Sequence, residues 1–269
     1  MKIITWNING YRSIVGQNPS KRYSTITKEN KLFDYIDSEK PDIVCLQETK
    51  ATPEQIDVDK IKPVGYLAYY NSATNKKGYS GVATFTKIKP KKIEYGLGNE
   101  KFDIEGRVIR TDYDDFILYN IYFPKGYEDS ERLDFKLEFY DYLFDVLKEL
   151  KKNQKNIIIS GDFNTAHNEI DLARPKENIN TSGFMPIERK KIDQLIELGF
   201  MDSFRLFCKE PNHYTWWSQR GRARENNIGW RIDYHFVSKE LVNKITNVYQ
   251  QPTVYGSDHC PVVIEINLS

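Results

Sequence analysis

The segment Ile157-Ile158-Ile159-Ser160-Gly161-Asp162-Phe163-Asn164 carries the strongest fold signal in the chain. Three consecutive isoleucines are typical of a strand that is buried on both faces. Asp162 and Asn164 follow two positions apart and therefore lie on the same side of the strand end. A buried carboxylate beside an amide is costly unless a metal, a phosphate or an activated water satisfies both groups. A structural Asx turn is the alternative interpretation.

Short runs rich in β-branched and aromatic residues predict further strands on both sides of this segment. The predicted strands span residues 2–6, 42–46, 67–70, 81–86, 108–113, 116–122, 156–160, 232–237 and 262–266. The clearest helix is predicted at 131–152, where apolar residues recur three or four positions apart, at Leu133, Leu137, Tyr140, Phe144 and Leu147. Weaker patterns predict helices at 27–38 and 188–198. Neither repeats nor a long linker divides the chain, so we expect one α+β domain over residues 1–269, with two packed sheets flanked by helices.

Composition limits the classes of function. The formal net charge is only +1, so contact with a polyanion has to come from local clusters of basic residues. An odd set of cysteines, Cys45, Cys208 and Cys260, in a chain without a signal peptide indicates a reduced, intracellular protein. No apolar run approaches the roughly 20 residues that cross a bilayer. We therefore expect a cytoplasmic monomer without a membrane partner.

Polar segments adjoin the predicted strands at 13–30, 71–79, 125–131, 167–187 and 219–229, and we expect these loops to share one face. Asn7 and Asn9 follow the first strand, although Asn9-Gly10 is also a favoured turn pair. Glu48 follows the strand at 42–46. There it either ligates a hard cation or is simply the first solvated position past the core.

The pair Asp258-His259 joins a carboxylate that can ligate a hard metal to an imidazole that can take a proton from water. Asp233 could hold the His259 ring in one tautomer, or it could simply pair with Arg231. Tyr122 closes another strand, and its phenol can donate to an anionic oxygen. Most of the 18 tyrosines must nevertheless be structural.

A local basic cluster lies near the carboxyl end of the chain. It comprises Arg220, Arg222, Arg224 and Arg231, interleaved with Trp216, Trp217, Trp230, Asn226 and Asn227. Guanidinium groups beside aromatic rings suit phosphates and exposed sugar or base faces. A run of charge is usually only a solvated loop, but the neighbouring tryptophans favour nucleic acid as the ligand.

Taken together, these motifs resemble the exodeoxyribonuclease III and apurinic/apyrimidinic (AP) endonuclease family, within the DNase I-like endonuclease/exonuclease/phosphatase superfamily. The resemblance covers nearly the whole chain through Trp6-Asn7, Leu46-Gln47-Glu48-Thr49-Lys50, Gly78-Tyr79-Ser80-Gly81-Val82, Glu105-Gly106-Arg107-Val108, Tyr122-Phe123-Pro124, Gly161-Asp162-Phe163-Asn164, Gly229-Trp230-Arg231-Ile232-Asp233-Tyr234 and Ser257-Asp258-His259. Each motif is weak alone, whereas their ordered set is specific. The resemblance implies a four-layer α/β sandwich in which two mixed sheets are flanked by helices.

The resemblance also implies roles for the site residues. Glu48 would be the principal Mg²⁺ ligand, with Mn²⁺ as a substitute metal. The other members of the implied metal set are Asn7, Asp162, Asn164, Asp258 and His259, with Asp162 and Asn164 at a candidate second position. Asp162 would orient or deprotonate the attacking water, or protonate the leaving oxygen. Asn164 and Tyr122 would donate to the phosphorane oxygens, and His259, backed by Asp233, would act as a base or a phosphate clamp.

The implied main activity is Mg²⁺-dependent cleavage of duplex DNA 5′ to abasic sites, which leaves a 3′-hydroxyl. The resemblance also allows two further activities, 3′-5′ exonuclease activity and 3′-phosphodiesterase activity at blocked 3′ ends. A prokaryotic source would make the protein nucleoid-associated. The implied DNA contacts are Asn9, Arg12, Tyr79, His167, Arg174, Lys176, Trp216, Arg220, Arg222, Arg224, Asn226, Trp230 and Ile232. Of these, Trp216, Trp230 and Ile232 would receive the flipped-out abasic sugar.

Two segments depart from the family pattern. Arg220-Gly221-Arg222 replaces apolar residues that animal enzymes insert into the duplex, and residues 13–30 are longer and more basic than in compact bacterial members. A phosphoesterase of the same fold that acts on RNA or a phospholipid is one alternative function. The other is a catalytically idle DNA-binding module, which salt-sensitive binding without turnover would reveal.

Overall fold

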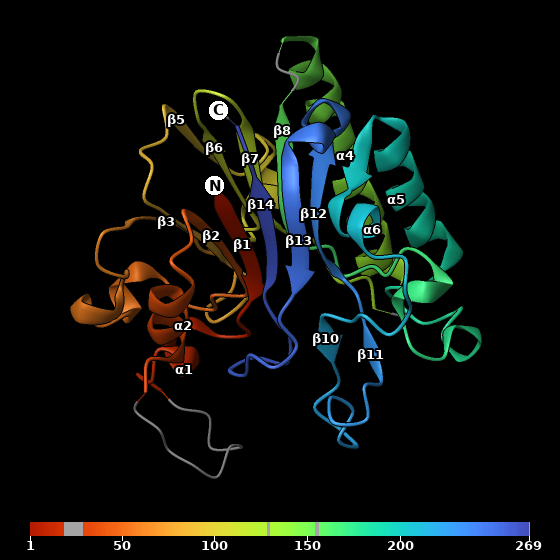
Figure 1. Cartoon of the computed structure of the whole chain (residues 1–269), viewed down its shortest axis with the longest axis horizontal. Helices are drawn as coiled ribbons and strands as arrows, with labels where there is room; N and C mark the ends of the chain where they lie inside the picture. Colours follow the sequence, from red (N-terminus) through yellow and green to blue (C-terminus); the bar gives the residue numbers. More distant parts are fainter. Residues whose placement is uncertain (19–28, 128–129, 154–155, 269) are drawn as a thin grey trace.

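Two six-stranded sheets pack face to face in the computed structural model, which describes residues 1–18, 29–127, 130–153 and 156–268 (Figure 1). The strand orders are β13-β14-β1-β2-β4-β3 and β5-β6-β7-β8-β12-β9. Each sheet has a central parallel pair, β1 with β2 and β7 with β8, and is antiparallel elsewhere. Both sheets are therefore mixed.

The first sheet consists of β13 (Ile245–Gln250), β14 (Val262–Ile266), β1 (Lys2–Asn7), β2 (Ile43–Gln47), β4 (Val82–Thr86) and β3 (Leu67–Asn71). The second consists of β5 (Lys92–Tyr95), β6 (Val108–Asp112), β7 (Ile117–Tyr122), β8 (Ile157–Asp162), β12 (Asp233–Ser238) and β9 (Phe200–Asp202). A separate two-stranded sheet pairs β10 (Trp216–Trp217) with β11 (Gly229–Trp230). The helices are α1 (Tyr11–Ile14), α2 (Lys31–Glu39), α3 (Glu100–Asp103), α4 (Ser130–Asn153), α5 (Pro186–Glu197) and α6 (Ser203–Phe207). Short 3₁₀ helices include η3 (Glu169–Asp171) and η4 (Pro175–Glu177).

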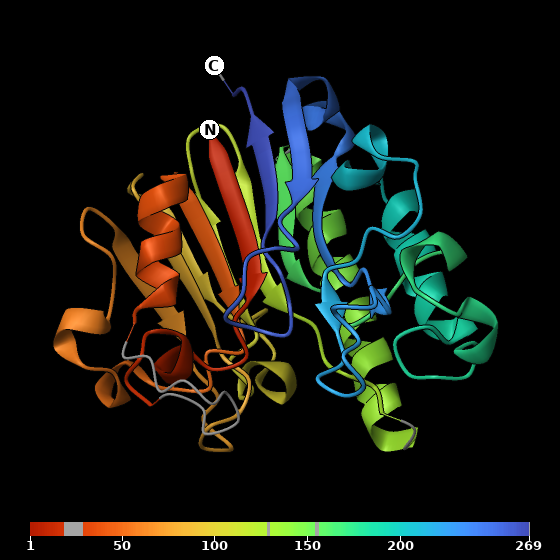
Figure 2. The ribbon, with the colours of Figure 1, turned by 60° about the horizontal axis from the view of Figure 1, so that its bottom comes forward.

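Three buried clusters separate four layers. One lies between the sheets and includes Ile3, Cys45, Leu118, Ile158 and Ile264. The second lies beneath α1 and α2 and includes Trp6, Tyr11, Ile36, Leu46 and Phe85. The third lies beneath α4 and α5 and includes Phe123, Tyr140, Ile159, Ile192 and Phe236. Figure 2 shows helices on both outer faces, which confirms the predicted two sheets flanked by helices. Within the described ranges, no helix is both long and apolar enough to cross a bilayer.

The isoleucine strand is buried on both faces, as its sequence predicts. Ile158 faces the other sheet, whereas Ile157 and Ile159 pack beneath the helices. The strand continues past the predicted end at residue 160, because Asp162 still pairs with Tyr122 of β7 and Asp233 of β12. The carboxylate is thus part of the sheet.

The predicted elements omit several short or edge elements. Strands β5, β9 and β13 were not predicted, and β13 lacks a clear apolar alternation because it is an edge strand with exposed Thr246 and Asn247. Helices α1, α3 and α6 are too short for a periodic signal. The helix predicted at 27–38 begins at Lys31, where the Asn30 side chain accepts a hydrogen bond from Phe33 N. Residues 27 and 28 lie outside the described part.

The two parallel pairs bring four strand ends to one edge of the molecule. β1, β2, β7 and β8 all end there, while β12 and β14 begin there, at the lower edge in Figure 1. A Cβ atom on Gly161 would lie 1.8 Å from the Ile121 carbonyl oxygen, so glycine permits the close approach of β7 and β8 at this edge. Of the segment at 13–30, residues 19–28 lie outside the described part.

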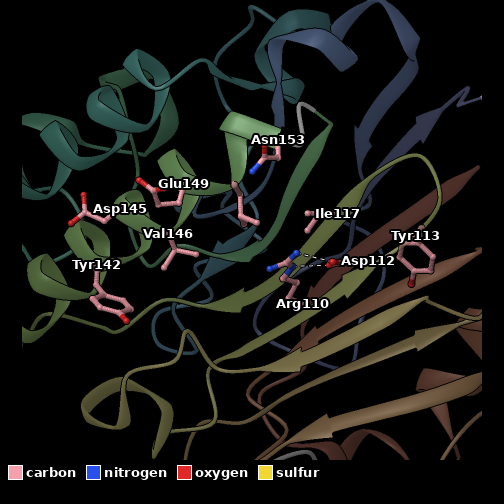
Figure 3. Close-up of a pocket in the computed structure, with 10 residues that line it drawn as sticks. Arg110, Asp112, Tyr113, Ile117, Tyr142, Asp145, Val146, Glu149 and Asn153 are labelled. Atoms are coloured by element: carbon pink, nitrogen blue, oxygen red, sulfur yellow. Dashed lines mark hydrogen bonds and ion pairs between the residues drawn. The ribbon is translucent and has the colours of Figure 1, made fainter.

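A pocket of about 780 Å³ lies between β6, β7 and α4, near the end of β7 remote from Tyr122 (Figure 3). Ile117 and Val146 line it, together with the Arg110–Asp112 ion pair and the acidic Glu149. None of the predicted site residues borders this pocket.

A buried histidine in β12 is expected to make stability depend on pH. His235 Nε2 donates to Val262 O at 3.0 Å, and Nδ1 lies 2.7 Å from Ser160 Oγ. Burial lowers the pKa of His235 to about 4, despite the bond to Val262. The unfolded chain, with a histidine pKa of about 6.5, therefore takes up the proton first as the pH falls.

We expect this residue to contribute a loss of about 3 kcal/mol in the free energy of unfolding as the pH falls from about 6.5 to about 4. Urea unfolding of the wild type and of His235→Gln across this range measures the effect. The substitution should flatten the profile even if it lowers stability at pH 7. Parallel profiles would contradict the prediction.

Candidate active site

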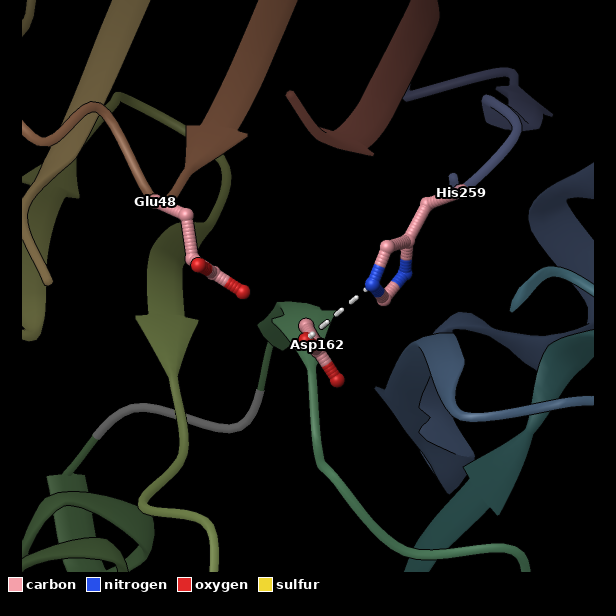
Figure 4. A group of neighbouring side chains, drawn as sticks. All are labelled: Glu48, Asp162 and His259. Atoms are coloured by element: carbon pink, nitrogen blue, oxygen red, sulfur yellow. Dashed lines mark ion pairs between the residues drawn. The ribbon is translucent and has the colours of Figure 1, made fainter. Parts of the chain in front are cut away.

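Glu48, Asp162 and His259 converge at the strand-end edge (Figure 4). Glu48 follows β2 in a left-handed conformation with φ 54°, Asp162 closes β8, and His259 precedes β14. One potential ligand atom from each lies within 4.8 Å of the others. Asp162 is 1% exposed and His259 4% exposed, so two of the three groups are nearly removed from water.

The Asn7 side chain joins the two carboxylates. Its Nδ2 donates to Glu48 Oε1 and to Asp162 Oδ2, each at 2.8 Å. Its Oδ1 accepts from the Asn9 backbone N–H at 3.0 Å. In this structure Asn7 therefore orients both acids through its nitrogen, whereas a metal ligand would have to present its oxygen.

Asp162 forms the Asx turn that was the alternative interpretation of its motif, and it also belongs to the cluster with Glu48 and His259. Its Oδ1 accepts from the Asn164 backbone N–H at 2.8 Å, while Oδ2 lies 3.9 Å from His259 Nε2. Burial, followed by the neighbouring Asp233 carboxylate, raises the pKa of Asp162 to about 7. The Asn164 side chain donates to Phe123 O at 2.9 Å, which places it beside Asp162. At neutral pH Asp162 can thus both accept and release a proton.

His259 and Asp233 form a buried pair. His259 Nδ1 lies 2.9 Å from Asp233 Oδ2, and both residues are nearly inaccessible. Burial alone would lower the pKa of His259, but the charges of Asp233, Asp162 and Asp258 outweigh it and raise the pKa to about 10. Arg231, the alternative partner for Asp233, instead pairs with Asp171 and Asp202.

Asp258 lies beside the cluster rather than in it. Its carboxylate accepts from Asn9 Nδ2 at 2.9 Å and from Trp216 Nε1 at 3.3 Å. Asn9 Oδ1 in turn accepts from Lys50, whose Nζ lies 2.6 Å from Glu48 Oε2. Asp258, which the sequence predicted as a metal ligand, is thus linked to Glu48 indirectly, through Asn9 and Lys50 and through Ser257 and Asn7.

Lys50 is a site residue that the sequence did not predict. Burial would raise the pKa of Glu48, but Lys50, Asn7 and His259 together hold it below its usual value, so Glu48 is ionised at neutral pH. Lys50 follows Glu48 by two positions in the same motif, and this spacing was the only sequence feature that could have indicated a pairing of the two side chains. The direction of its long side chain could not be read from that spacing.

Tyr122 stands beside the acids at the end of β7. Burial and the Glu48 carboxylate raise the pKa of its phenol well above the usual value, so it remains a hydrogen-bond donor. The Arg107 guanidinium lies 4.7 Å from the ring centroid and donates to Tyr122 O at 3.0 Å. The Tyr79 hydroxyl accepts from Arg107 at 2.9 Å and from Arg132 at 3.0 Å. The sequence predicted no role for Arg107 or Arg132, although Arg107 lies in the motif Glu105-Gly106-Arg107-Val108, which contributes to the family resemblance.

Trp216, Trp230 and Ile232 form one apolar cluster with Leu172 and Phe184. The Trp216 ring centroid lies 6.3 Å from that of Trp230 and 6.5 Å from that of His259. Both indole rings remain partly exposed. Trp216 therefore adjoins the acidic cluster at His259, and Trp230 and Ile232 belong to the same apolar cluster as Trp216.

The other predicted DNA contacts divide into exposed and internally bonded side chains. Arg174, Lys176, Arg220, Arg222 and Asn226 are exposed, and Arg12 is partly exposed on α1. His167 is partly buried, and its ring nitrogens contact Asp193 and Asn168.

Arg224, a predicted DNA contact, is bonded within the protein. It donates to Pro252 O, Val254 O and Ser257 O, and its guanidinium lies 4.6 Å from the Trp217 ring centroid. These bonds hold the segment that precedes Asp258. The sequence did not predict this internal role, because the three carbonyls come together only through the conformation of their loop, which no local sequence pattern indicates.

The donor set fits a hard divalent cation. Glu48 and Asp162 supply carboxylate oxygens, the ligands such ions prefer, whereas a protonated His259 lies beside them without a free nitrogen to offer. The raised pKa of Asp162 shows that the residues around it leave its buried negative charge incompletely compensated. A bound cation would supply the missing compensation.

Comparisons with known proteins agree with this geometry. Residues 4–259 match the model of the Endonuclease/Exonuclease/phosphatase family. The chain is 40% identical over 269 residues to an exodeoxyribonuclease of Bacillus subtilis, covering 100% of both chains. It is 39% identical over 272 residues to a DNA-(apurinic or apyrimidinic site) endonuclease of Dictyostelium discoideum, covering 100% of this chain and 71% of that protein.

The fold matches a 3′ phosphatase from Neisseria that was solved with a product DNA hairpin. The TM-score is 0.86 at 25% identity, with 99% of each chain covered. A full-length match at 40% identity is far stronger than a shared fold alone. The chain therefore belongs to the Endonuclease/Exonuclease/phosphatase family, as an enzyme of its exodeoxyribonuclease and AP endonuclease type.

Proposed function

We propose that this enzyme hydrolyses the phosphodiester bond 5′ to an abasic site in duplex DNA and leaves a 3′-hydroxyl, with Mg²⁺ as its metal and Mn²⁺ as a substitute. The observation that carries the proposal is the direct contact between two features. The cluster of Glu48, Asp162 and His259 adjoins Trp216 at His259, and Trp216 packs against Trp230; both tryptophans are partly exposed. Residues 1–269 would act as one domain, which the buried cluster shared by both sheets supports.

Glu48 and Asp162 would hold the metal, which when bound neutralises phosphate charge and favours ionisation of water. Asp162 takes the proton of the attacking water or returns one to the leaving oxygen, a role that its place beside Glu48 and His259 supports. The Tyr122 phenol and Asn164 amide donate to the non-bridging oxygens. His259, kept cationic by Asp233, neutralises negative charge that develops on the phosphate.

Selectivity would come from the apolar cluster. A deoxyribose without a base can contact the Trp216 and Trp230 rings once it leaves the helix, whereas a normal nucleotide also carries a base that has to be unstacked. The exposed Arg220 and Arg222 are placed on a loop beyond β10, where guanidinium groups can reach phosphates or the duplex interior.

Incision of one duplex tests substrate and metal together. A 5′-labelled duplex with a central tetrahydrofuran abasic analogue should be cut once, immediately 5′ to the analogue, in the presence of Mg²⁺ and not with EDTA. A matched duplex with a normal nucleotide is the control. Equal cutting of both duplexes, or incision that EDTA does not affect, would contradict the proposal.

A second candidate function is removal of phosphate or other blocking groups from 3′ ends, combined with 3′-5′ exonuclease activity. The structural similarity to the Neisseria 3′ phosphatase favours it. A duplex with a recessed 3′-phosphate distinguishes the two functions, because release of phosphate without incision of the abasic duplex would support the second alone.

A further inference from the structure

A fully buried ion pair lies behind the reaction centre. Lys136 of α4 and Glu188 of α5 are both 0% exposed, and Lys136 Nζ lies 2.6 Å from Glu188 Oε1. Burial lowers the pKa of Lys136 even though the Glu188 charge opposes that shift. Burying two charges is expensive, and replacing such a pair by neutral groups often costs little stability. The other contacts of this pair indicate what it contributes.

One set of contacts leads to the reacting acids. Lys136 Nζ also donates to Asn164 O at 2.7 Å. Asn164 has a left-handed backbone with φ 48°, and its N–H is the donor to Asp162 Oδ1. The ammonium group therefore holds the backbone carbonyl of Asn164, the residue whose N–H orients the Asp162 carboxylate.

The second set leads to the apolar cluster. Glu188 Oε2 accepts from Gly183 N at 2.6 Å and from Met185 N at 3.2 Å. A Cβ atom on Gly183 would lie 3.1 Å from Asn164 O and 3.2 Å from the Trp230 ring. The loop that Glu188 holds thus touches both Asn164 and the wall of the candidate sugar site.

We propose that Lys136 and Glu188 are positioning residues that fix Asn164 and Asp162 relative to Trp230, without touching substrate. The sugar-site part of this inference rests on the proposed function. Because a displacement of about 1 Å at a reaction centre can cost about 10²-fold in rate, the pair would act on kcat while leaving the DNA-contacting surface intact.

The test compares the Lys136→Met/Glu188→Gln double variant with Lys151→Met. The double variant removes both charges but keeps a side-chain acceptor for Gly183 N. Lys151 is a matched control because it also lies on α4 and donates to a backbone carbonyl after α5, Leu198 O at 2.8 Å. We expect kcat on the abasic duplex to fall about 10- to 100-fold in the double variant and to stay unchanged in Lys151→Met. KM should change little.

Two further variants separate positioning from folding. Lys136→Arg keeps the charge and should recover most of kcat. Glu188→Gln alone keeps an acceptor for Gly183 N and Met185 N but leaves the Lys136 charge without its carboxylate, so both the free energy of unfolding and kcat should fall. Binding of the uncleaved duplex in EDTA should be unchanged wherever urea unfolding shows this variant folded, which supplies a result if the double variant does not fold. A folded double variant with wild-type kcat, or an equal loss of kcat in Lys151→Met, would overturn the inference.

A simple diester keeps the two proposals distinguishable. Bis(p-nitrophenyl) phosphate has no sugar, so its hydrolysis reports on the reaction centre, which includes Asp162 and Asn164, without the candidate sugar site. We expect the double variant to lose kcat on this ester too. A wild type that cleaves the ester but leaves the abasic duplex intact would contradict only the proposed function, and the loss in the double variant would still decide the positioning role.

Discussion

Asp162→Asn is expected to abolish nearly all DNA cleavage, with kcat falling about 10³-fold or more. The substitution preserves shape but removes the group that can exchange a proton near neutral pH and hold a cation. Asp162 is buried, and its pKa is raised to about 7 by burial and by Asp233. An amide relieves that unfavourable charge, so the free energy of unfolding should stay equal or rise while activity is lost.

The combination of lost activity and retained stability is what identifies a catalytic group here. Single-turnover incision measures the first quantity and urea unfolding the second. The matched control is Asp193→Asn. Asp193 lies on α5, and its exposed carboxylate contacts His167, so this substitution should leave kcat nearly unchanged. An Asp162→Asn variant with more than about a tenth of wild-type kcat would contradict a proton-transfer or metal-holding role.

Asp233→Asn is expected to lower kcat on the order of 10²-fold at pH 8, with a smaller loss at pH 6. Asp233 is the strongest influence raising the pKa of His259 against the effect of burial. Without this carboxylate the pKa falls, so the imidazolium is lost at alkaline pH and restored as the pH falls. The ratio of variant to wild-type kcat should therefore rise toward acid pH.

A double-mutant cycle isolates this dependence. If Asp233 acts through His259, Asp233→Asn should have little further effect in a His259→Ala background. Asp233 also raises the pKa of Asp162, so any change in the variant-to-wild-type ratio that persists in the His259→Ala background measures the effect through Asp162. A ratio that is constant from pH 6 to pH 8, or independent losses in the two variants, would show that Asp233 does not act through the charge of His259.

The strand framework could be predicted because its pattern is local. The isoleucine run at 157–159 packs against both neighbouring layers. The polar residues at the ends of β1 and β8 and just after β2 meet at one edge because parallel strands end together. The family resemblance identified these polar residues as well, from the order of their motifs along the chain. The edge strands β5, β9 and β13 were not predicted, and in β13 exposed polar residues weaken the pattern.

The bonding within the site depended on long-range geometry. The sequence could not show that Asn7 presents its nitrogen, that Asp258 faces Asn9 and Trp216, or that Arg224 holds three distant carbonyls. The burial of Lys136, however, could have been predicted from the sequence. It lies three positions after Leu133 and four before Tyr140, on the apolar side of its helix, where a charged residue requires a buried partner.

The most direct test of the central claim is single-turnover incision of the tetrahydrofuran duplex by the wild type, Glu48→Gln and Asp162→Asn, with saturating enzyme and Mg²⁺. We predict one wild-type product with a 3′-hydroxyl, cut immediately 5′ to the analogue. Both variants should bind the duplex as the wild type does but cut it about 10³-fold more slowly. Wild-type cleavage rates in either variant, or a product that ends in a 3′-phosphate, would contradict the account.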